Sequence, residues 1–190
     1  MQDLPIDAWC RGLAELPEGG FVSAVNGYVQ RFGVATDSVA RYAFFRPDRY
    51  TRNLVFKNDL FEVLLLCWDR GTQSAIHNHR DQECWMVMVS GCLEVVNYRA
   101  EERDPSRGHC RLSPSSTFRI TRKRPVGIDQ DEPIHAVFNC SDRGERAMSV
   151  HVYSRPFDTC EIYDFVAQTY RDVRLHYDSV YGEEDASDAV

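Results

Sequence analysis

From about residue 54 onward, the chain consists of short runs rich in β-branched and aromatic residues, with turn residues between them. Such runs predict short strands in a sandwich or barrel, because these side chains favour extended backbone and the interruptions leave no room for long helices. The runs cover residues 54–56, 61–68, 84–89, 93–98, 118–121, 135–139 and 148–153. The predicted fold class is therefore mainly β.

The first part of the chain has a different pattern. Residues 6–13 and 21–32 repeat apolar side chains every three or four positions, which predicts two helices, and Thr36 favours the start of a third. The length of 190 residues suits one domain. We expect a single domain (1–190) with N-terminal helices (1–45), a β-barrel (50–178) and a flexible acidic tail (182–190).

Composition narrows the function classes. The net charge of −7 argues against nucleic acid or an anionic membrane as the main partner, and no apolar stretch reaches membrane-spanning length. The seven cysteines form no C-x-x-C pair, and the N-terminus lacks the basic start and apolar run of a signal peptide. We therefore expect a cytoplasmic protein whose cysteines are thiols.

Two histidines, His77 and His79, stand one residue apart in a β-rich context. Side chains at i and i+2 of a strand project from the same face, so both imidazoles can reach one point. Neutral imidazole is a common ligand of divalent metals, and His135 in another apolar run offers a third. The alternative is that the pair lies on a solvated strand face.

Helices followed by many short strands, with candidate ligands on two of them, favour a jelly-roll barrel. The spacing of Gly71, His77, His79 and Gly91, followed by His135, resembles the two motifs of the cupins.

Many cupins add a carboxylate ligand near the position of Glu83 or Cys84. With Gly91 setting the register, that position falls on Cys84 and Glu83 points away. Three neutral histidines would then favour an anionic ligand from outside, such as a thiolate. If Glu83 were a ligand, a cupin isomerase or a 2-oxoglutarate-type oxygenase would fit instead.

Ser149, His151 and Tyr153 alternate with valines and share one face of a predicted strand. They could form a hydrogen-bonded row in which His151 orients the phenol. The same alternation is typical of a strand with one face in solvent.

Taken together, these stretches resemble the cysteine dioxygenases, thiol dioxygenases of the cupin superfamily. The matching segments are 50–55, 66–68, 74–84, His135 with Asn139, and 149–160. They occur in the family's order and cover the whole expected barrel. The resemblance implies a cupin-type jelly-roll β-barrel with a small helical N-terminal region.

The resemblance also implies metal and substrate ligands. His77, His79 and His135 would hold Fe(II). Arg52 would pair with the substrate carboxylate, which suits a planar guanidinium fork, and Tyr50 would help to line that pocket. Without the resemblance, Arg52 could be a surface arginine whose stem packs on apolar neighbours.

Three further residues receive catalytic roles by resemblance. Tyr153 would place its hydroxyl near substrate and oxygen, supported by His151 and Ser149. Cys84 matches the cysteine that forms a thioether bond to this tyrosine in some family members, and it could equally be an inert buried thiol. The animal-type pattern has Ser-Pro-Pro after the tyrosine, but here Arg155 follows Ser154. A cis bond before a non-proline residue costs about 2.5–4 kcal/mol, which puts a cis bond at this step in doubt.

The implied activity is that of an oxidoreductase of cysteine catabolism, which converts free L-cysteine and O2 to cysteine sulfinic acid. We expect a monomer. The alternatives are a dioxygenase for another small thiol such as 3-mercaptopropionate, and a non-enzymatic metal-binding cupin. Arg52 favours cysteine, because the 3-mercaptopropionate branch typically has glutamine there.

Overall fold

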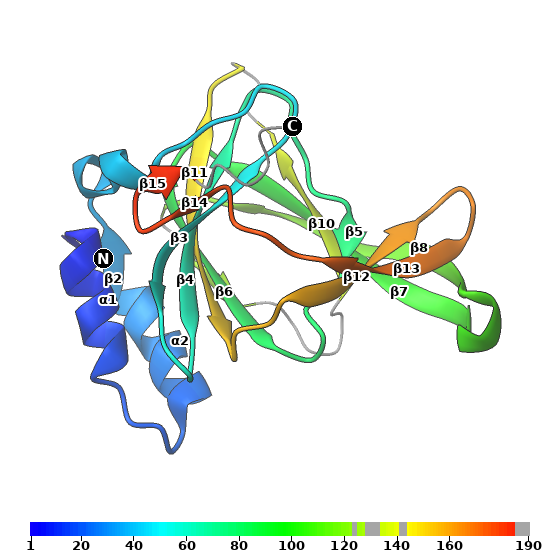
Figure 1. Ribbon diagram of the computed structural model, residues 1–190, viewed down its shortest axis with the longest axis horizontal. Helices are drawn as coiled ribbons and strands as arrows, with labels where there is room; N and C mark the ends of the chain where they lie inside the picture. Colours follow the sequence, from blue (N-terminus) through cyan, green and yellow to red (C-terminus); the bar gives the residue numbers. More distant parts are fainter. Residues whose placement is uncertain (123–124, 128–133, 141–143, 185–190) are drawn as a thin grey trace.

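The computed structural model describes residues 1–122, 125–127, 134–140 and 144–184. Helices lie at one end of the molecule, and two long hairpins extend from the other (Figure 1). The helices are α1 (Ile6–Ala14), α2 (Phe21–Arg31) and the 3-10 segments η1 (Thr36–Tyr42) and η2 (Pro105–Arg107). The strands are β1 (Gln2–Leu4), β2 (Phe32–Val34), β3 (Thr51–Lys57), β4 (Glu62–Trp68), β5 (Ile76–His77), β6 (Glu83–Ser90), β7 (Leu93–Asp104), β8 (His109–Ile120), β9 (Val126–Gly127), β10 (Ile134–Asn139), β11 (Ala147–Ser154), β12 (Thr159–Asp164), β13 (Thr169–Arg174), β14 (Ser179–Val180) and β15 (Glu183–Glu184).

The strands form three sheets. A closed barrel has the order β10-β5-β12-β13-β8-β7, and a seven-stranded sheet has the order β15-β14-β3-β4-β11-β6-β9. Strands β1 and β2 form a separate parallel pair beside the helices. The prediction of a mainly β barrel with a small helical N-terminal region is confirmed. None of the helices in the described segments is long and apolar enough to span a bilayer.

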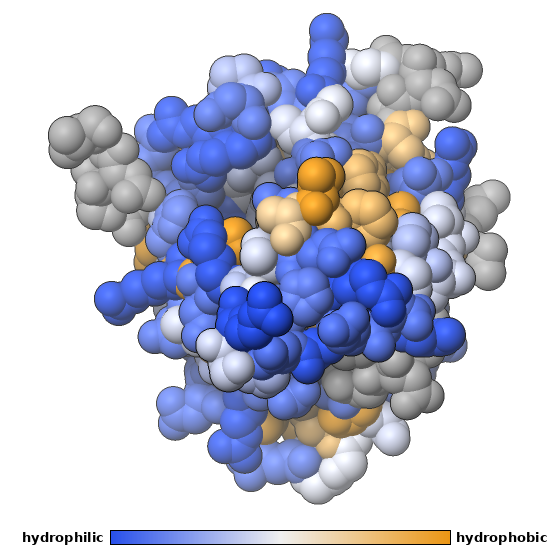
Figure 2. Space-filling model, turned by 90° about the vertical axis from the view of Figure 1, so that its right-hand side faces the viewer, coloured by the Kyte–Doolittle hydropathy of each residue, from blue (hydrophilic) through white to orange (hydrophobic). Residues whose placement is uncertain are grey.

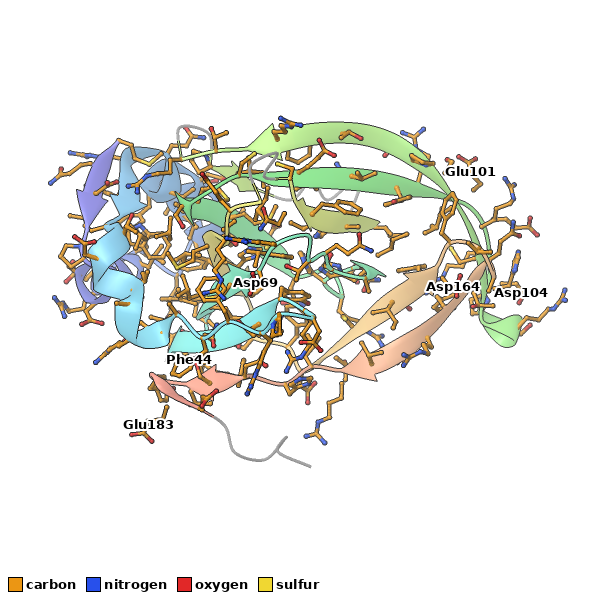
Figure 3. The ribbon with its side chains drawn as sticks, turned by 90° about the horizontal axis from the view of Figure 1, so that it is seen from above. Phe44, Asp69, Glu101, Asp104, Asp164 and Glu183 are labelled. Atoms are coloured by element: carbon orange, nitrogen blue, oxygen red, sulfur yellow. The ribbon has the colours of Figure 1, made fainter. Side chains whose placement is uncertain are left out.

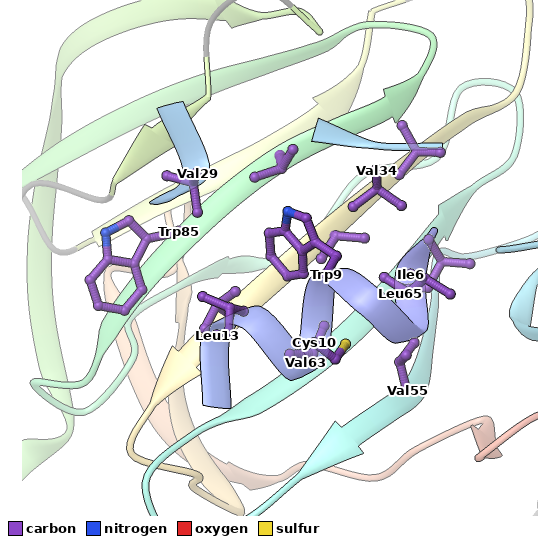
Figure 4. Close-up of a cluster of buried hydrophobic side chains, with 14 of the residues drawn as sticks. Ile6, Trp9, Cys10, Leu13, Val29, Val34, Val55, Val63, Leu65 and Trp85 are labelled. Carbon is purple, nitrogen blue, oxygen red and sulfur yellow. The ribbon is translucent and has the colours of Figure 1, made fainter. Parts of the chain in front are cut away.

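The N-terminal helices cover the outer face of the seven-stranded sheet. Ile6, Trp9 and Leu13 follow a helical period and are almost fully buried. They pack with residues from the sheet, including Val63 and Leu65, in one apolar cluster (Figure 4). This helical layer explains why the sheet strands are apolar on both faces.

Alternation along β4 shows how the sheet divides its side chains. Val63 and Leu65 belong to the cluster under the helices, whereas Leu64 and Leu66 belong to a second cluster inside the fold. Strand β11 follows the same rule: Val150 and Val152 face the helices. Its polar row therefore faces the interior rather than solvent.

The far end of the molecule is built by the β7–β8 and β12–β13 hairpins. Figure 3 shows Glu101 and Asp104 toward the tip of the first hairpin, with Asp164 of the second beside it. The turn after Asp164 exposes Phe165 and Val166. Figure 2 shows that this end is largely hydrophilic with a small apolar patch.

Two residues of the predicted acidic tail form a short strand, Glu183–Glu184. Glu183–Glu184 pair with Ser179–Val180, which in turn pair in parallel with β3. Backbone hydrogen bonds therefore order two residues that the acidic composition had placed in a flexible tail. The remainder of that prediction, residues 185–190, lies outside the described residues.

Candidate metal centre and its cavity

Three histidines converge inside the fold. His77 of β5 is the register partner of His135 of β10, and His79 follows β5 by two residues. One ring nitrogen from each lies within 4.8 Å of the others. His79 is not on the same strand as His77, contrary to the sequence prediction, because β5 ends at His77. The rings nevertheless meet at one point.

Two of these histidines, His77 and His79, are held neutral. Burial lowers the pKa of His77 to about 4 and that of His79 well below its usual value. With Nδ1 of His77 taken as the protonated nitrogen, it donates to the Ala75 carbonyl at 2.9 Å and leaves Nε2 as the ligand atom. The buried Nδ1 of His79 has no hydrogen-bond partner among the described residues. Neutral imidazoles with an unused nitrogen suit a borderline divalent metal.

Among the described residues, no carboxylate belongs to the histidine cluster. Glu83 begins β6, pairs in register with Ser154, and is absent from the histidine cluster and from the described cavity lining. The alternative in which Glu83 is a metal ligand is therefore wrong. Three neutral ligands leave a divalent charge uncompensated, which favours an anionic ligand from outside.

Tyr153 stands at the end of a hydrogen-bonded row. The Trp68 indole N–H donates to Ser149 Oγ at 3.0 Å, Ser149 Oγ lies 2.9 Å from His151 Nε2, and His151 Nδ1 lies 3.2 Å from Tyr153 Oη. If the Ser149 hydroxyl donates to Nε2, neutral His151 carries its proton on Nδ1 and donates to Tyr153. Tyr153 then keeps its own hydroxyl proton to donate toward the cavity.

Burial fixes the charge state of this row. Burial, together with the positive charge of Arg52, lowers the pKa of His151 to about 3. Burial also raises the pKa of Tyr153 well above its usual value. Both groups are therefore neutral near pH 7, and Tyr153 is a hydrogen-bond donor rather than a phenolate.

Arg52 lies beside the same cavity, which has a volume of about 270 Å³. The cavity is lined by the three clustered histidines and by Tyr50, Arg52, His151 and Tyr153, among others. Arg52 donates through Nε to the His176 carbonyl at 3.3 Å, and its Nη2 has no hydrogen-bond partner among the described residues. Tyr50 stacks on Trp68, with ring centroids 4.6 Å apart. The alternative of a surface arginine is wrong, because Arg52 is only 9% exposed.

Cys84 lies opposite Tyr153 in the β6–β11 ladder, as register partner. Its Sγ is 3.9 Å from His151 Nδ1, and burial raises the pKa of the thiol, although a hydrogen bond with Tyr153 opposes that rise. The pairing brings together the two residues of the candidate thioether, and the bond itself stays a prediction.

Glu62 is a residue near the site that the sequence analysis missed. It is fully buried at the start of β4, where Tyr177 Oη donates to its Oε2 at 2.6 Å and Lys57 Nζ lies at 3.5 Å. Its Oε1 is 4.0 Å from Arg52 Nη2, so Glu62 supplies a counter-charge to the guanidinium in the interior. In the sequence, an acidic residue within the apolar run 61–68 could have indicated this contact, because a buried charge requires a partner.

Two features mark the segment after Tyr153. The Ser154–Arg155 peptide bond is cis, although the cost of a cis bond before a non-proline residue had put it in doubt. The bond lies where β11 ends beside Gln82, whose side-chain oxygen accepts from the Arg155 backbone N–H. The Arg155 side chain is exposed and is absent from the described cavity lining.

Comparisons with known proteins converge on one family. The family model "Cysteine dioxygenase type I" matches residues 22–166. Cysteine dioxygenase type 1 of Danio rerio is 32% identical over 163 residues, covering 85% of this chain and 79% of the relative. The Rattus norvegicus protein of the same name is 33% identical over 144 residues, covering 75% of this chain and 70% of the relative.

Two solved structures align with part of the chain at low sequence identity. A protein with a double-stranded β-helix domain from Klebsiella pneumoniae aligns with a TM-score of 0.48 and 15% identity, covering 62% of this chain and 82% of its own. A cupin domain from Bordetella pertussis aligns with a TM-score of 0.42 and 17% identity, covering 60% of this chain and all of its own.

Proposed function

Because the chain belongs to the cysteine dioxygenase family, we propose that it oxidises free L-cysteine with O2 to cysteine sulfinic acid. The cofactor in this proposal is Fe(II), held by His77, His79 and His135. Both oxygen atoms end on the cysteine sulfur, so the reaction needs no external reductant. Bound iron would supply the redox chemistry that couples a thiolate to dioxygen.

The observation that carries the proposal is a carboxylate-free histidine cluster that shares one cavity with Arg52. Among the described residues no protein anion joins the cluster, and in this proposal the opposite charge comes with the substrate as a thiolate. Arg52 supplies a buried cation for the substrate carboxylate, which fits a guanidinium better than an ammonium because of its planar fork. A small anionic thiol with a carboxylate satisfies both ends of the cavity.

In this proposal, Tyr153 positions the reactants. Its hydroxyl, oriented by His151 and Ser149, donates a hydrogen bond to the substrate carboxylate or to oxygen. Because burial keeps the phenol protonated, this donor persists across the neutral pH range. The apolar walls around Phe157 and Leu66 keep bulk water from the reacting sulfur.

The test is oxygen consumption by the anaerobically Fe(II)-loaded protein, with L-cysteine and 3-mercaptopropionate at equal concentration. We expect faster uptake with cysteine and one sulfinate per O2 consumed. Faster uptake with 3-mercaptopropionate would overturn the substrate but keep the site. No uptake with either thiol, in protein shown to contain iron, would overturn the dioxygenase proposal.

A further inference from the structure

Two of the seven cysteines lie against each other outside the cavity. Cys92 Sγ and Cys140 Sγ are 2.8 Å apart, closer than the van der Waals separation of two sulfur atoms, and both residues are half-buried. The other five cysteines are buried. The pair has no part in the proposed cysteine oxidation, so a different explanation is needed.

The backbone holds the two cysteines opposite each other. Strands β7 and β10 are antiparallel, and their last register pair is Leu93 with Asn139 (Figure 1). One further step in the same register pairs Cys92 with Cys140. Directly opposed residues of antiparallel strands have Cα atoms about 4.5–5.5 Å apart, which lies within the range that a disulfide spans.

The turn before Cys92 leaves this position little freedom. Gly91 has a positive φ of 73°, and a Cβ at that position would come within 2.7 Å of the Ala147 Cβ. A close turn packed against β11 therefore fixes where β7 begins and where the Cys92 side chain starts. The sulfur contact follows from the strand register and this turn rather than from the chance meeting of two loops.

We propose that Cys92 and Cys140 form a reversible disulfide site that exchanges with small-molecule disulfides. One protein thiolate attacks a sulfur of the small disulfide and releases one small thiol. The second protein thiolate then displaces the other small thiol and closes the Cys92–Cys140 bond. In total, two protein thiols and one small disulfide give one protein disulfide and two small thiols, so electrons and atoms balance.

The thiolate is the attacking species in both steps. Burial and the contact with Cys92 together raise the pKa of the Cys140 thiol to about 12. The closed bond would tie the β6–β7 turn to β10, which carries His135 five residues before Cys140. The proposal holds whatever ligand the cavity binds.

The test uses the full-length protein and cystine as the small disulfide. Reduced protein is incubated with excess cystine, free thiols are counted after denaturation, and the linked peptides are identified by mass. We expect the loss of two thiols, one peptide pair containing Cys92 and Cys140, and full reversal by dithiothreitol. Loss of no thiols, or a link between other cysteines, would overturn the proposal.

Variants separate this pair from general oxidation. The Cys92→Ser variant should keep all its remaining thiols, apart from the slow formation of mixed disulfides. The Cys110→Ala variant, in which a buried cysteine outside the pair is removed, should still lose two thiols. A mixed disulfide that persists on Cys92 of the wild-type protein, without closure onto Cys140, would also contradict the site. The wild-type result does not depend on any variant folding.

Discussion

At the scale of single residues, Arg52 is the side chain that most directly tests the substrate. Its Nη2 lacks a hydrogen-bond partner among the described residues, although a buried donor without a hydrogen bond is unfavourable. A substrate carboxylate would supply that partner. Arg52→Gln should therefore raise KM for L-cysteine roughly 10- to 100-fold, with a smaller effect on kcat, because a charge-assisted hydrogen bond contributes about 1.5–3 kcal/mol.

Initial rates of oxygen uptake over a range of cysteine concentrations measure this effect. Arg155→Gln is the matched control, because Arg155 is an exposed cation near the site but absent from the described cavity lining. Its KM should stay near the wild-type value. Equal effects of the two substitutions would show that Arg52 acts only through overall charge.

Cys84 offers a second test at this scale. Thioether formation with Tyr153 removes two hydrogen atoms, and its strand register places Cys84 directly opposite that tyrosine. After turnover of the iron-loaded protein with cysteine and O2, we expect a fraction of the protein to be lighter by the mass of two hydrogen atoms, and this change to be irreversible. Dithiothreitol does not reverse a thioether, so intact mass after full reduction distinguishes it from the Cys92–Cys140 disulfide. Cys84→Ala should show no such species.

At the scale of elements, Ser74 links the segment just before the short strand β5 to β10. The Val137 backbone N–H of β10 donates to Ser74 Oγ at 2.9 Å, and Ser74 Oγ donates to the Ala75 carbonyl at 2.9 Å. That carbonyl also accepts from His77 Nδ1. Ser74 therefore links β10 to the group that orients a candidate metal ligand.

Ser74→Ala should weaken metal binding about 10-fold or more, the usual effect of removing a group that orients a ligand histidine. Equilibrium titration with Co(II) under anaerobic conditions measures the affinity without requiring activity. Ser113→Ala, at an exposed hydroxyl of β8, is a control that should leave the affinity unchanged. An unchanged affinity in Ser74→Ala would mean that the strand pairing of His77 with His135 orients the ring on its own.

The elements also show what the sequence can reveal. The helices and the apolar strands were predictable because burial imposes a period, as at Trp9 in α1 and Leu65 in β4. Strands β7 and β8 extend well beyond the predicted runs, to Asp104 and from His109, because backbone pairing continues where side chains are polar and exposed. Part of β8 was not predicted because Pro114 argues against a strand. In the structure Pro114 lies at an irregularity in the strand pairing, where a proline is tolerated.

The candidate site was predictable to the extent that each residue type carries its own chemistry. His77, His79 and the polar row of β11 were identifiable from spacing. Spacing could not show that Glu62 and Ser74 contact the site, because their contacts join segments far apart in the sequence. Nor could spacing show that Cys92 faces Cys140, which depends on the register of two strands.

At the scale of the whole molecule, the buried histidines link folding to pH. The pKa values of His77 and His151 are lowered to about 4 and about 3, first by burial, and that of His79 is also well below its usual value. In the unfolded chain a histidine has a pKa near ~6.5. Below that pH the unfolded chain binds more protons than the folded one. Stability is therefore complete above about pH 6.5 and falls as the pH drops toward 4.

Urea unfolding of the metal-free protein between pH 7 and pH 5 measures this dependence. The hydrogen bond from Arg146 lowers the pKa of Asp69, and hydrogen bonds from Tyr163 and Arg103 lower the pKa of Glu161 despite its burial, so these carboxylates favour their charged form. We expect a loss on the order of 1 kcal/mol per pH unit for each buried histidine below its unfolded pKa. His151→Gln should flatten the slope by one histidine's share. A wild-type free energy of unfolding that stays constant from pH 7 to pH 5 would mean that the histidines take up protons without unfolding, so that the cavity admits water and counter-ions to the cluster.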